Sequence, residues 1–199
     1  LFFFPFFLWL DNCKGLVCES IDLFNEKLNF DQLASKMTFI EVSPLDEKKY
    51  YKFVSEHLKA KKLVLSEELF AEILQKTGEL TSERQLFFKT LFDKYSDLTL
   101  TSAHVQEVFV QIVEQYSEIY EMLLGDLTDN QKNVLVRLAL EPEVKVYSKQ
   151  FCEQLNIQNT NTVVKILQSL INKKLLYKKQ SSYLIFSPYF KYWIDLNEK

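Results

Sequence analysis

Residues 127–193 constrain the fold most, because their pattern predicts two short helices, then an amphipathic helix, then two runs of β-forming residues. The first helix is expected to begin at Thr128 or Asp129, whose side chains can accept hydrogen bonds from the free N–H groups of a first helical turn. It should end near Pro142, since a proline ring does not fit the interior of a helix. The second short helix is predicted over 148–155.

The third helix is expected to begin near Thr160, and its sequence carries an apolar and a polar stripe at helical spacing. The apolar stripe consists of Val163, Ile166, Leu167, Leu170 and Ile171. The polar stripe consists of Asn161, Lys165, Gln168, Ser169 and Asn172. One face is therefore predicted to pack against the other helices, and the opposite face is predicted to be free to contact a partner.

The runs 175–178 and 183–186 are rich in residues that favour β-strands, and the polar residues between them suit a hairpin turn. Three helices followed by a hairpin predict a winged helix, a variant of the helix-turn-helix in which the third helix and the hairpin, called the wing, are presented together. The predicted binding surface combines the polar face of the third helix with nearby lysines. Its residues are Asn161, Lys165, Gln168, Asn172, Lys173, Lys174, Lys178 and Lys179.

Charge is distributed unevenly along the chain. No Asp or Glu lies between Leu155 and Ile194, whereas the same stretch holds six lysines. Because the whole chain has a formal charge of −3 and this stretch contributes +6, the remainder carries −9. Such segregation favours contact with phosphates or an acidic partner, although lysines also simply solvate an exposed helix and hairpin. The only arginines are Arg84 and Arg137, so the third helix and the wing lack the residue that most often reads guanine.

Residues 45–125 show a continuous helical pattern, and four helices are expected there to close one core. Asp46 and Ser66 are suited to cap the first two helices, and Gly78 is suited to end the second. The fourth is expected to be a single long helix over 102–124. The inner positions predicted for the first three helices are Tyr50, Phe53, Val54 and Leu58, then Leu69, Phe70, Ile73 and Leu74, then Leu86, Phe87, Thr90 and Leu91.

Residues 1–44 predict a short piece of α/β structure. The run 1–10 is almost entirely apolar and is expected to pair as a strand inside a sheet, although Pro5 disfavours a central strand and a reading-frame artefact stays open as an explanation. The run lacks the basic flank of a signal peptide, and no segment reaches the roughly 18 to 20 apolar residues of a membrane span. The 3 cysteines have no recognised metal spacing, so reduced thiols and a cytoplasmic location are expected, with no membrane partner.

The sequence offers few residues for catalysis or for binding a metal or a small molecule. Gly15, Gly78 and Gly125 stand alone, so there is no glycine-rich phosphate loop. His57 and His104 lack a partner at metal-ligand spacing, and no Ser or Cys has a base at a recognisable motif distance. No catalytic residue, metal ligand or small-molecule substrate is therefore predicted, and whether the chain belongs to an enzyme stays open.

Several short segments occur in an informative order. They are 37–45 (MTFIEVSPL), 51–54 (YKFV), 127–131 (LTDNQ) and 187–190 (SPYF), the last followed by Trp193 and Ile194. Over 37–194 this order resembles the C-terminal half of the prokaryotic AAA+/STAND-like P-loop ATPases. In that family an α/β nucleotide-binding core leads into a helical lid, and a winged helix follows the lid.

The resemblance implies three domains, with 1–44 as the remnant of the α/β core, 45–125 as a lid-like helical bundle and 126–199 as the winged helix. The fold class is then mainly α, a four-helix lid-type bundle followed by a winged helix. The phosphate loop of the family would lie upstream, so ATP and magnesium are expected only with the missing P-loop core, and this chain alone should not hydrolyse ATP. The resemblance implies a nucleotide close to the third lid helix, where Arg84 is placed to reach it, although this helix lacks the Gly and Pro of the family and an ordinary exposed arginine is the alternative.

The resemblance also implies that the lid closes over nucleotide while the winged helix binds DNA or another protein. Two alternatives are open. A free-standing winged-helix DNA-binding protein would use the same lysines, and its binding would weaken as salt rises. A helical and winged-helix scaffold, similar in layout to PCI-type assemblies, would bind proteins and would expose an apolar stripe.

Overall fold

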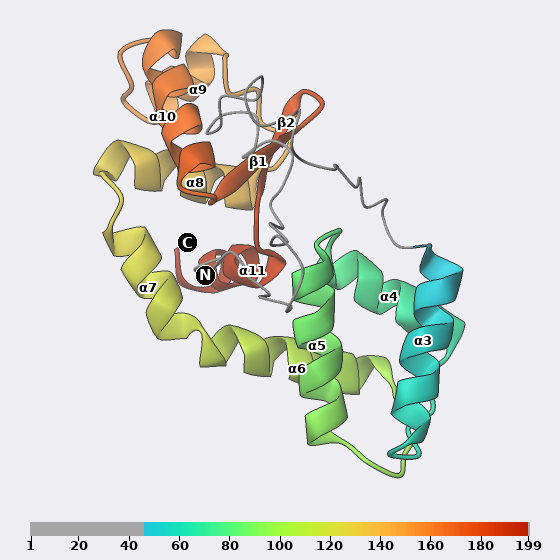
Figure 1. Ribbon diagram of the computed structural model, residues 1–199. Helices are drawn as coiled ribbons and strands as arrows, with labels where there is room; N and C mark the ends of the chain where they lie inside the picture. Colours follow the sequence, from blue (N-terminus) through green and yellow to red (C-terminus); the bar gives the residue numbers. More distant parts are fainter. Residues whose placement is uncertain (1–45, 199) are drawn as a thin grey trace, which may run out of the picture. The chain divides into compact units, whose positions relative to one another are not determined.

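The computed structural model describes residues 46–198, and this part of the chain is mainly helical with one small sheet near its C-terminal end (Figure 1). The predictions for 1–44, with the apolar run 1–10, Cys13 and Cys18, lie outside the described residues. The helices are α3 (Glu47–Lys59), α4 (Glu67–Thr77), α5 (Thr81–Lys94), α6 (Ser102–Gln115), α7 (Ser117–Gly125), α8 (Asp129–Leu140), α9 (Lys149–Gln154), α10 (Thr160–Asn172) and α11 (Pro188–Asn197), and the strands are β1 (Leu176–Lys179) and β2 (Ser182–Ile185).

Helices α3 and α4 begin at the residues that the sequence predicts, and α4 also ends where predicted. The side chain of Asp46 accepts a hydrogen bond from the Lys49 N–H at 2.9 Å, and Ser66 caps α4 in the same way at 3.2 Å. Gly78 follows α4 with a φ of 69°, in the left-handed region that favours glycine. Caps of this kind satisfy backbone groups that a helix end leaves free, so local sequence sets these boundaries.

The inner positions of α3 and α5 differ from the prediction at a few residues. Phe53 was expected inside but is 56 % exposed, because the buried side of α3 is centred on Val54, one position further along the helix. On α5, Leu86 is half-buried and packs against the core, and Thr90 is half-buried. Phe88, which was not predicted as an inner residue, is buried, and its ring lies against aromatic rings from α3 and α4.

The prediction of one long helix over 102–124 is wrong. The chain breaks at Tyr116, with φ −103° and ψ 5°, and α6 and α7 run in different directions in Figure 1. After the break, Ser117 and Tyr120 face α11, where the Ser117 hydroxyl accepts a hydrogen bond from Trp193 Nε1 at 2.8 Å and the Tyr120 ring packs against two aromatic rings. Tertiary packing therefore overrides an uninterrupted helical pattern.

Helices α8, α9 and α10 and the two strands follow one another in the order predicted for a winged helix. Thr128 starts α8 through reciprocal hydrogen bonds with Gln131, and the helix ends ahead of Pro142 as expected. Ser148 caps α9 and Asn159 caps α10, each by accepting a hydrogen bond from a backbone N–H three residues on. Short-range capping again sets the helix boundaries.

Strands β1 and β2 form an antiparallel hairpin whose limits differ by one residue from the predicted runs. Lys179 pairs with Ser182, so Gln180 and Ser181 alone make the turn, and Gln180 has a φ of 54°. β1 packs against α10 and β2 packs against α8. One side of the wing is thereby attached to the helices of the same module.

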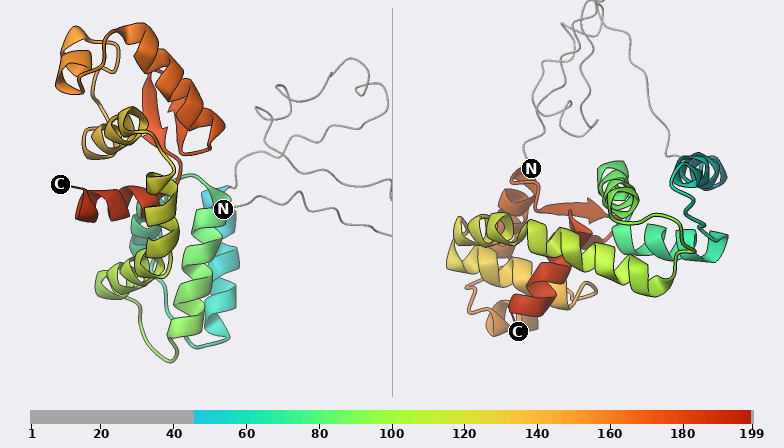
Figure 2. Two further views of the ribbon diagram at one scale, coloured as in Figure 1. Left: turned by 90° about the vertical axis from the view of Figure 1, so that its left-hand side faces the viewer. Right: turned by 90° about the horizontal axis from the view of Figure 1, so that it is seen from below.

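Helix α11 has no counterpart among the predicted elements. Its first residue is Pro188, and it follows Ser187, whose hydroxyl accepts a hydrogen bond from the Phe190 N–H at 3.4 Å. The helix contacts α8 and β2 and also α4, α6 and α7 (Figures 1 and 2). One apolar core runs from Tyr50 on α3 to Ile194 on α11. The four bundle helices thus share their core with the winged helix, and a four-helix lid is not confirmed.

Candidate nucleic-acid interface

The two faces of α10 differ in burial as their residue types suggest. Val163, Ile166, Leu167 and Leu170 are buried, whereas Ile171 is half-buried. The exposed side carries Asn161, Lys165, Gln168 and Asn172. These four positions are separated by four, three and four residues, so they form one stripe along the helix.

The exposed stripe of α10 is polar but not uniformly so. Gln168 Nε2 donates a hydrogen bond to Asn172 Oδ1 at 3.0 Å, which fixes the two amides relative to each other. Val164 lies on the same side and is 47 % exposed, so it adds an apolar contact surface. The stripe therefore offers a cation at Lys165, amide groups that can donate or accept, and one aliphatic side chain.

Lys173 and Lys174 follow α10 directly, and both side chains are exposed. Lys174 has a φ of 58°, and its N–H donates to the Ile171 carbonyl at 2.8 Å. This left-handed residue turns the chain from α10 into β1. The two lysines are thus placed at the C-terminal end of the helix, next to the start of the wing.

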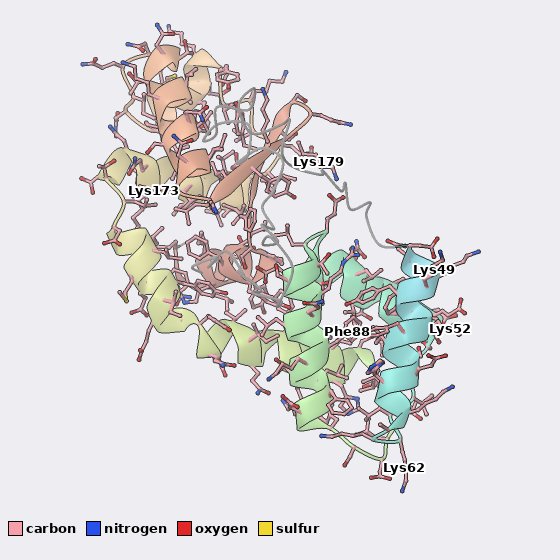
Figure 3. The ribbon with its side chains drawn as sticks, viewed as in Figure 1. Lys49, Lys52, Lys62, Phe88, Lys173 and Lys179 are labelled. Atoms are coloured by element: carbon pink, nitrogen blue, oxygen red, sulfur yellow. The ribbon has the colours of Figure 1, made fainter. Side chains whose placement is uncertain are left out.

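The wing lysines Lys178 and Lys179 are neighbours in sequence and lie on opposite faces of the hairpin, as the pleat of a strand requires. Lys178 Nζ lies 5.8 Å from the centre of the Tyr183 ring. Lys179 Nζ instead forms an ion pair at 2.5 Å with Glu79, in the connection between α4 and α5. The hydrogen bond to Glu79 raises the pKa of Lys179. Figure 3 labels Lys173 and Lys179, which lie well apart, so the structure does not gather all eight predicted residues into one patch.

The excess of lysine in the winged helix is partly neutralised by carboxylates that lie outside the acid-free stretch. Lys179 is paired with Glu79, and Lys191 is paired with Asp195 at 2.8 Å. Lys165, Lys173 and Lys178 have no ion pair with any residue of the described range 46–198. The charge of these three exposed lysines is available to a polyanion.

Comparison with known families bears on this module. A family model described as a probable winged helix domain matches residues 118–196. The chain contains a winged helix domain. The matched segment begins in α7 and ends in α11, so it includes the break after Tyr116 and the unpredicted last helix. No curated protein and no solved structure matches the chain. None of these comparisons supports an AAA+/STAND parent.

A tyrosine that the sequence did not single out lies beside the wing of this domain. Tyr147, in the connection between α8 and α9, is 49 % exposed, and its hydroxyl forms a 2.5 Å hydrogen bond with the hydroxyl of Tyr183 on β2. That hydrogen bond raises the pKa of Tyr147, so the phenol stays protonated near neutral pH. The two tyrosines are 36 residues apart in sequence, so no local sequence pattern could predict this contact.

Arg84, which the ATPase resemblance implies near a nucleotide, has a local structural contact. Its Nε donates a hydrogen bond to the Gly78 carbonyl at 2.7 Å, at the C-terminal end of α4. The carbonyl groups at a helix end lack partners within the helix, so this contact helps to satisfy one of them. A role for Arg84 beside a nucleotide stays a prediction.

Both histidines take part in local structural contacts. His104 takes part in the cap of α6 through Thr101, and His57 lies on the exposed side of α3 with its ring 4.2 Å from that of Phe53. Within the described part of the chain, no three His, Cys, Asp or Glu side chains are grouped as metal ligands would be. No helix there is both long and apolar enough to cross a membrane.

Proposed function

We propose that this chain binds nucleic acid through the exposed stripe of α10 and the wing of its winged helix domain. The observation that carries the proposal is the set of exposed lysines Lys165, Lys173 and Lys178, which have no ion pair with a described residue and belong to a stretch without Asp or Glu. Lysine ammonium groups bind phosphates as point charges and release the counterions condensed on the nucleic acid.

The chemistry of the stripe favours contact with the phosphate backbone over reading of sequence. Neither α10 nor the wing contains arginine, whose planar guanidinium is the commonest reader of guanine. Asn161 and Gln168 can in principle contact adenine, but Gln168 already donates a hydrogen bond to Asn172. The proposed binding is therefore dominated by charge, with weak sequence preference and a steep dependence on salt.

Charge reversal tests the surface directly. A variant carrying Lys165→Glu, Lys173→Glu and Lys178→Glu should lose binding to a labelled duplex or single strand in fluorescence anisotropy at low salt. The matched control carries Lys49→Glu, Lys52→Glu and Lys59→Glu, three exposed lysines of α3 with the same change in charge (Figure 3 labels Lys49 and Lys52). The control should keep most of the affinity.

A milder variant sharpens the same test. Neutral glutamines at the three winged-helix lysines should lower the slope of log affinity against log salt by about 2 to 3 for a duplex, because each contacted phosphate contributes close to one. Unchanged binding in the glutamate variant, or an equal loss in the α3 control, would overturn the proposed surface.

A protein-interaction scaffold is the second candidate, and α7 carries the observation that favours it. Ile119 and Met122, one helical turn apart, are 42 % and 69 % exposed. Exposed apolar side chains of this kind are common at protein interfaces when they form a larger patch. Static light scattering of the wild type and of Ile119→Ser with Met122→Ser tests for self-association. The P-loop core as partner, with ATP and magnesium bound there, stays a prediction that no comparison supports.

A further inference from the structure

The connection between α8 and α9 presents an aromatic ring beside the wing. Tyr147 directly precedes Ser148, the residue that caps α9, and about half of its side chain is exposed. Its hydroxyl is held by the hydroxyl of Tyr183, and the two rings are nearly perpendicular, at 80° with 6.3 Å between their centres. Since Tyr183 is 6 % exposed and belongs to β2, the orientation of Tyr147 is fixed by a buried neighbour.

A cation lies on the same side of the wing as this ring. Lys178 pairs with Tyr183 across the two strands, and its Nζ lies 5.8 Å from the centre of the Tyr183 ring. Lys178 is exposed and has no carboxylate partner among residues 46–198. Of the acidic residues close to Tyr147 in sequence, Glu141 is held by Arg137 at 2.8 Å, while Glu143 is exposed. An aromatic face and an available ammonium group therefore occur together.

We propose that Tyr147 stacks on an unpaired nucleobase while Lys178 binds a neighbouring phosphate, so that the ligand of this surface is single-stranded nucleic acid. The inference rests on the proposed function and specifies its ligand class. Both faces of a base inside a duplex are covered by neighbouring bases, whereas an unpaired base can stack on an aromatic side chain. Stacking is tolerant of sequence because every base has such a face, which agrees with the absence of arginine from α10 and the wing.

The geometry distinguishes Tyr147 from other exposed aromatic residues of the chain. Phe53 is exposed to a similar extent, 56 % against 49 %, but it lies on α3 and its ring is already in contact with that of His57. The hydroxyl of Tyr147 is engaged with Tyr183, so the ring rather than the hydroxyl is the group offered to a ligand. Phe53 is therefore a matched control for the loss of an exposed ring.

The test compares affinities for a labelled oligothymidylate and for a duplex of the same length by fluorescence anisotropy with the 199-residue chain. Tyr147→Ala should weaken binding of the single strand by about 5- to 100-fold, the usual effect of removing one stacked ring. Tyr147→Phe should stay within about twofold of the wild type, since it keeps the stacking face. Phe53→Ala should leave both affinities unchanged, and duplex binding should be the same in all four proteins.

A charge variant tests the second half of the site. Lys178→Gln should weaken binding of the single strand and lower its salt slope by about 0.7, the contribution of one phosphate contact to a single strand. Thermal unfolding of each variant identifies any loss of the folded state, which is expected to be small because Tyr147 is half-exposed.

The outcomes separate this inference from the proposed function. If the wild type binds neither ligand at low salt, the proposed function and the stacking site both fall. If the wild type binds but Tyr147→Ala binds the single strand equally well, only the stacking site falls. Equal losses in Tyr147→Phe and Tyr147→Ala would also overturn it, because the hydroxyl pair and not the ring would then be the necessary feature.

Discussion

Helices α10 and α11 belong to the same winged helix domain, yet they differ in how much of their surface is covered. α11 contacts α4, α6, α7, α8 and β2, and four of its ten residues, all aromatic or aliphatic, are buried. α10 contacts α8, α9 and β1 and leaves Asn161, Lys165, Gln168 and Asn172 of its polar stripe exposed, whereas Ser169 of that stripe is half-buried. The domain is therefore attached to the rest of the chain mainly through α11, whereas one face of α10 stays exposed.

The side-chain hydrogen bonds of the two helices show the same difference. On α11, Trp193 donates to Ser117, and Tyr192 accepts from Gln106 at 3.2 Å, so α11 is bonded to the helices that precede the winged helix. On α10, Ser169 accepts a hydrogen bond from Gln131 on α8 at 2.9 Å, within the winged helix domain, and Gln168 of the exposed stripe donates to Asn172 of its own helix. Since buried polar groups are costly to leave unpaired, the bonds of α11 restrict substitutions there much more than those of α10 restrict its exposed stripe.

The largest effect is expected from removing the largest side chain of α11, that of Trp193. Trp193→Ala should lower the free energy of unfolding by about 3 to 5 kcal/mol, because it leaves a cavity and an unpaired Ser117 hydroxyl. Leu196→Ala on the same helix should change stability by less than about 0.5 kcal/mol, since Leu196 is 54 % exposed. Urea unfolding measures both. Similar free energies of unfolding for the two variants would show that the buried face of α11 does not hold the winged helix domain to the helices that precede it.

A smaller loss of stability is expected from removing one buried hydroxyl group of α11, that of Tyr189. The Tyr189 side chain is fully buried on α11, and its hydroxyl donates to the Glu83 backbone carbonyl on α5 at 3.0 Å. Tyr189→Phe should cost about 0.5 to 1.5 kcal/mol, the usual net value of a buried hydrogen bond. Tyr192→Phe, which alters a half-buried hydroxyl, is the control and should cost less. An equal cost for both would mean that burial does not set the value of these bonds.

Much of the fold can be predicted because its signals are local. Asp46, Ser66, Thr128 and Ser148 each cap a helix where the sequence predicts one. The exposed stripe of α10 is likewise readable, because residues on one helix face are three or four positions apart. Capping residues and helix stripes depend on nearby sequence, so they can be recognised without knowing the tertiary contacts.

The elements that could not be predicted depend on distant parts of the chain. α11 is rich in tyrosine, phenylalanine and tryptophan, which favour strands, and its contacts with five elements leave little of the polar face that identifies a surface helix. The break at Tyr116 has no Gly or Pro to signal it. In the candidate site, the pair of Glu79 and Lys179 spans 100 residues, and nothing in the local sequence indicates it.

The carboxyl group of Glu83, on α5, is a titratable group that contacts the start of α11. This carboxyl group is 5 % exposed, and burial raises its pKa above the ordinary value of 4.5, while a hydrogen bond from Ser187 at the start of α11 acts in the opposite direction. The folded chain then holds the proton more tightly than the unfolded chain. The contribution of Glu83 to the free energy of unfolding is therefore greatest at low pH, falls as the pH rises from 4.5 through the raised pKa, and stays lowered above it.

Replacing the Glu83 carboxyl with an amide removes the free-energy cost of ionising a buried group. Glu83→Gln should raise the thermal unfolding midpoint by a few degrees at pH 8 and should leave it nearly unchanged at pH 4, where Glu83 is already protonated in the folded chain. Glu67→Gln, an exposed carboxylate on α4, should have little effect at either pH. A lower midpoint for Glu83→Gln at pH 8 would show that the ionised carboxylate stabilises the contact with α11.

The smallest expected effect concerns the connection between α4 and α5, which contacts the predicted binding surface through Glu79. Glu79 pairs with Lys179 on the wing, and both side chains are largely exposed. A hollow of about 160 Å³ lies nearby, lined by Leu80, Tyr177 and Leu184 among others. Because both side chains of the pair are largely exposed, salt or a competing phosphate can open it.

Glu79→Gln should therefore raise the affinity for a polyanion by about two- to fivefold, as expected for releasing an exposed pair. Adding Lys179→Gln should remove this gain, because the freed ammonium group would be absent. Glu67→Gln reports the effect of losing a negative charge elsewhere on the chain. If the double variant binds as tightly as Glu79→Gln alone, the gain does not come from Lys179, and an equal gain in Glu67→Gln would assign it to the overall charge. Either result would place Lys179 outside the nucleic-acid contact, which would then comprise α10, the lysines that follow it and Lys178.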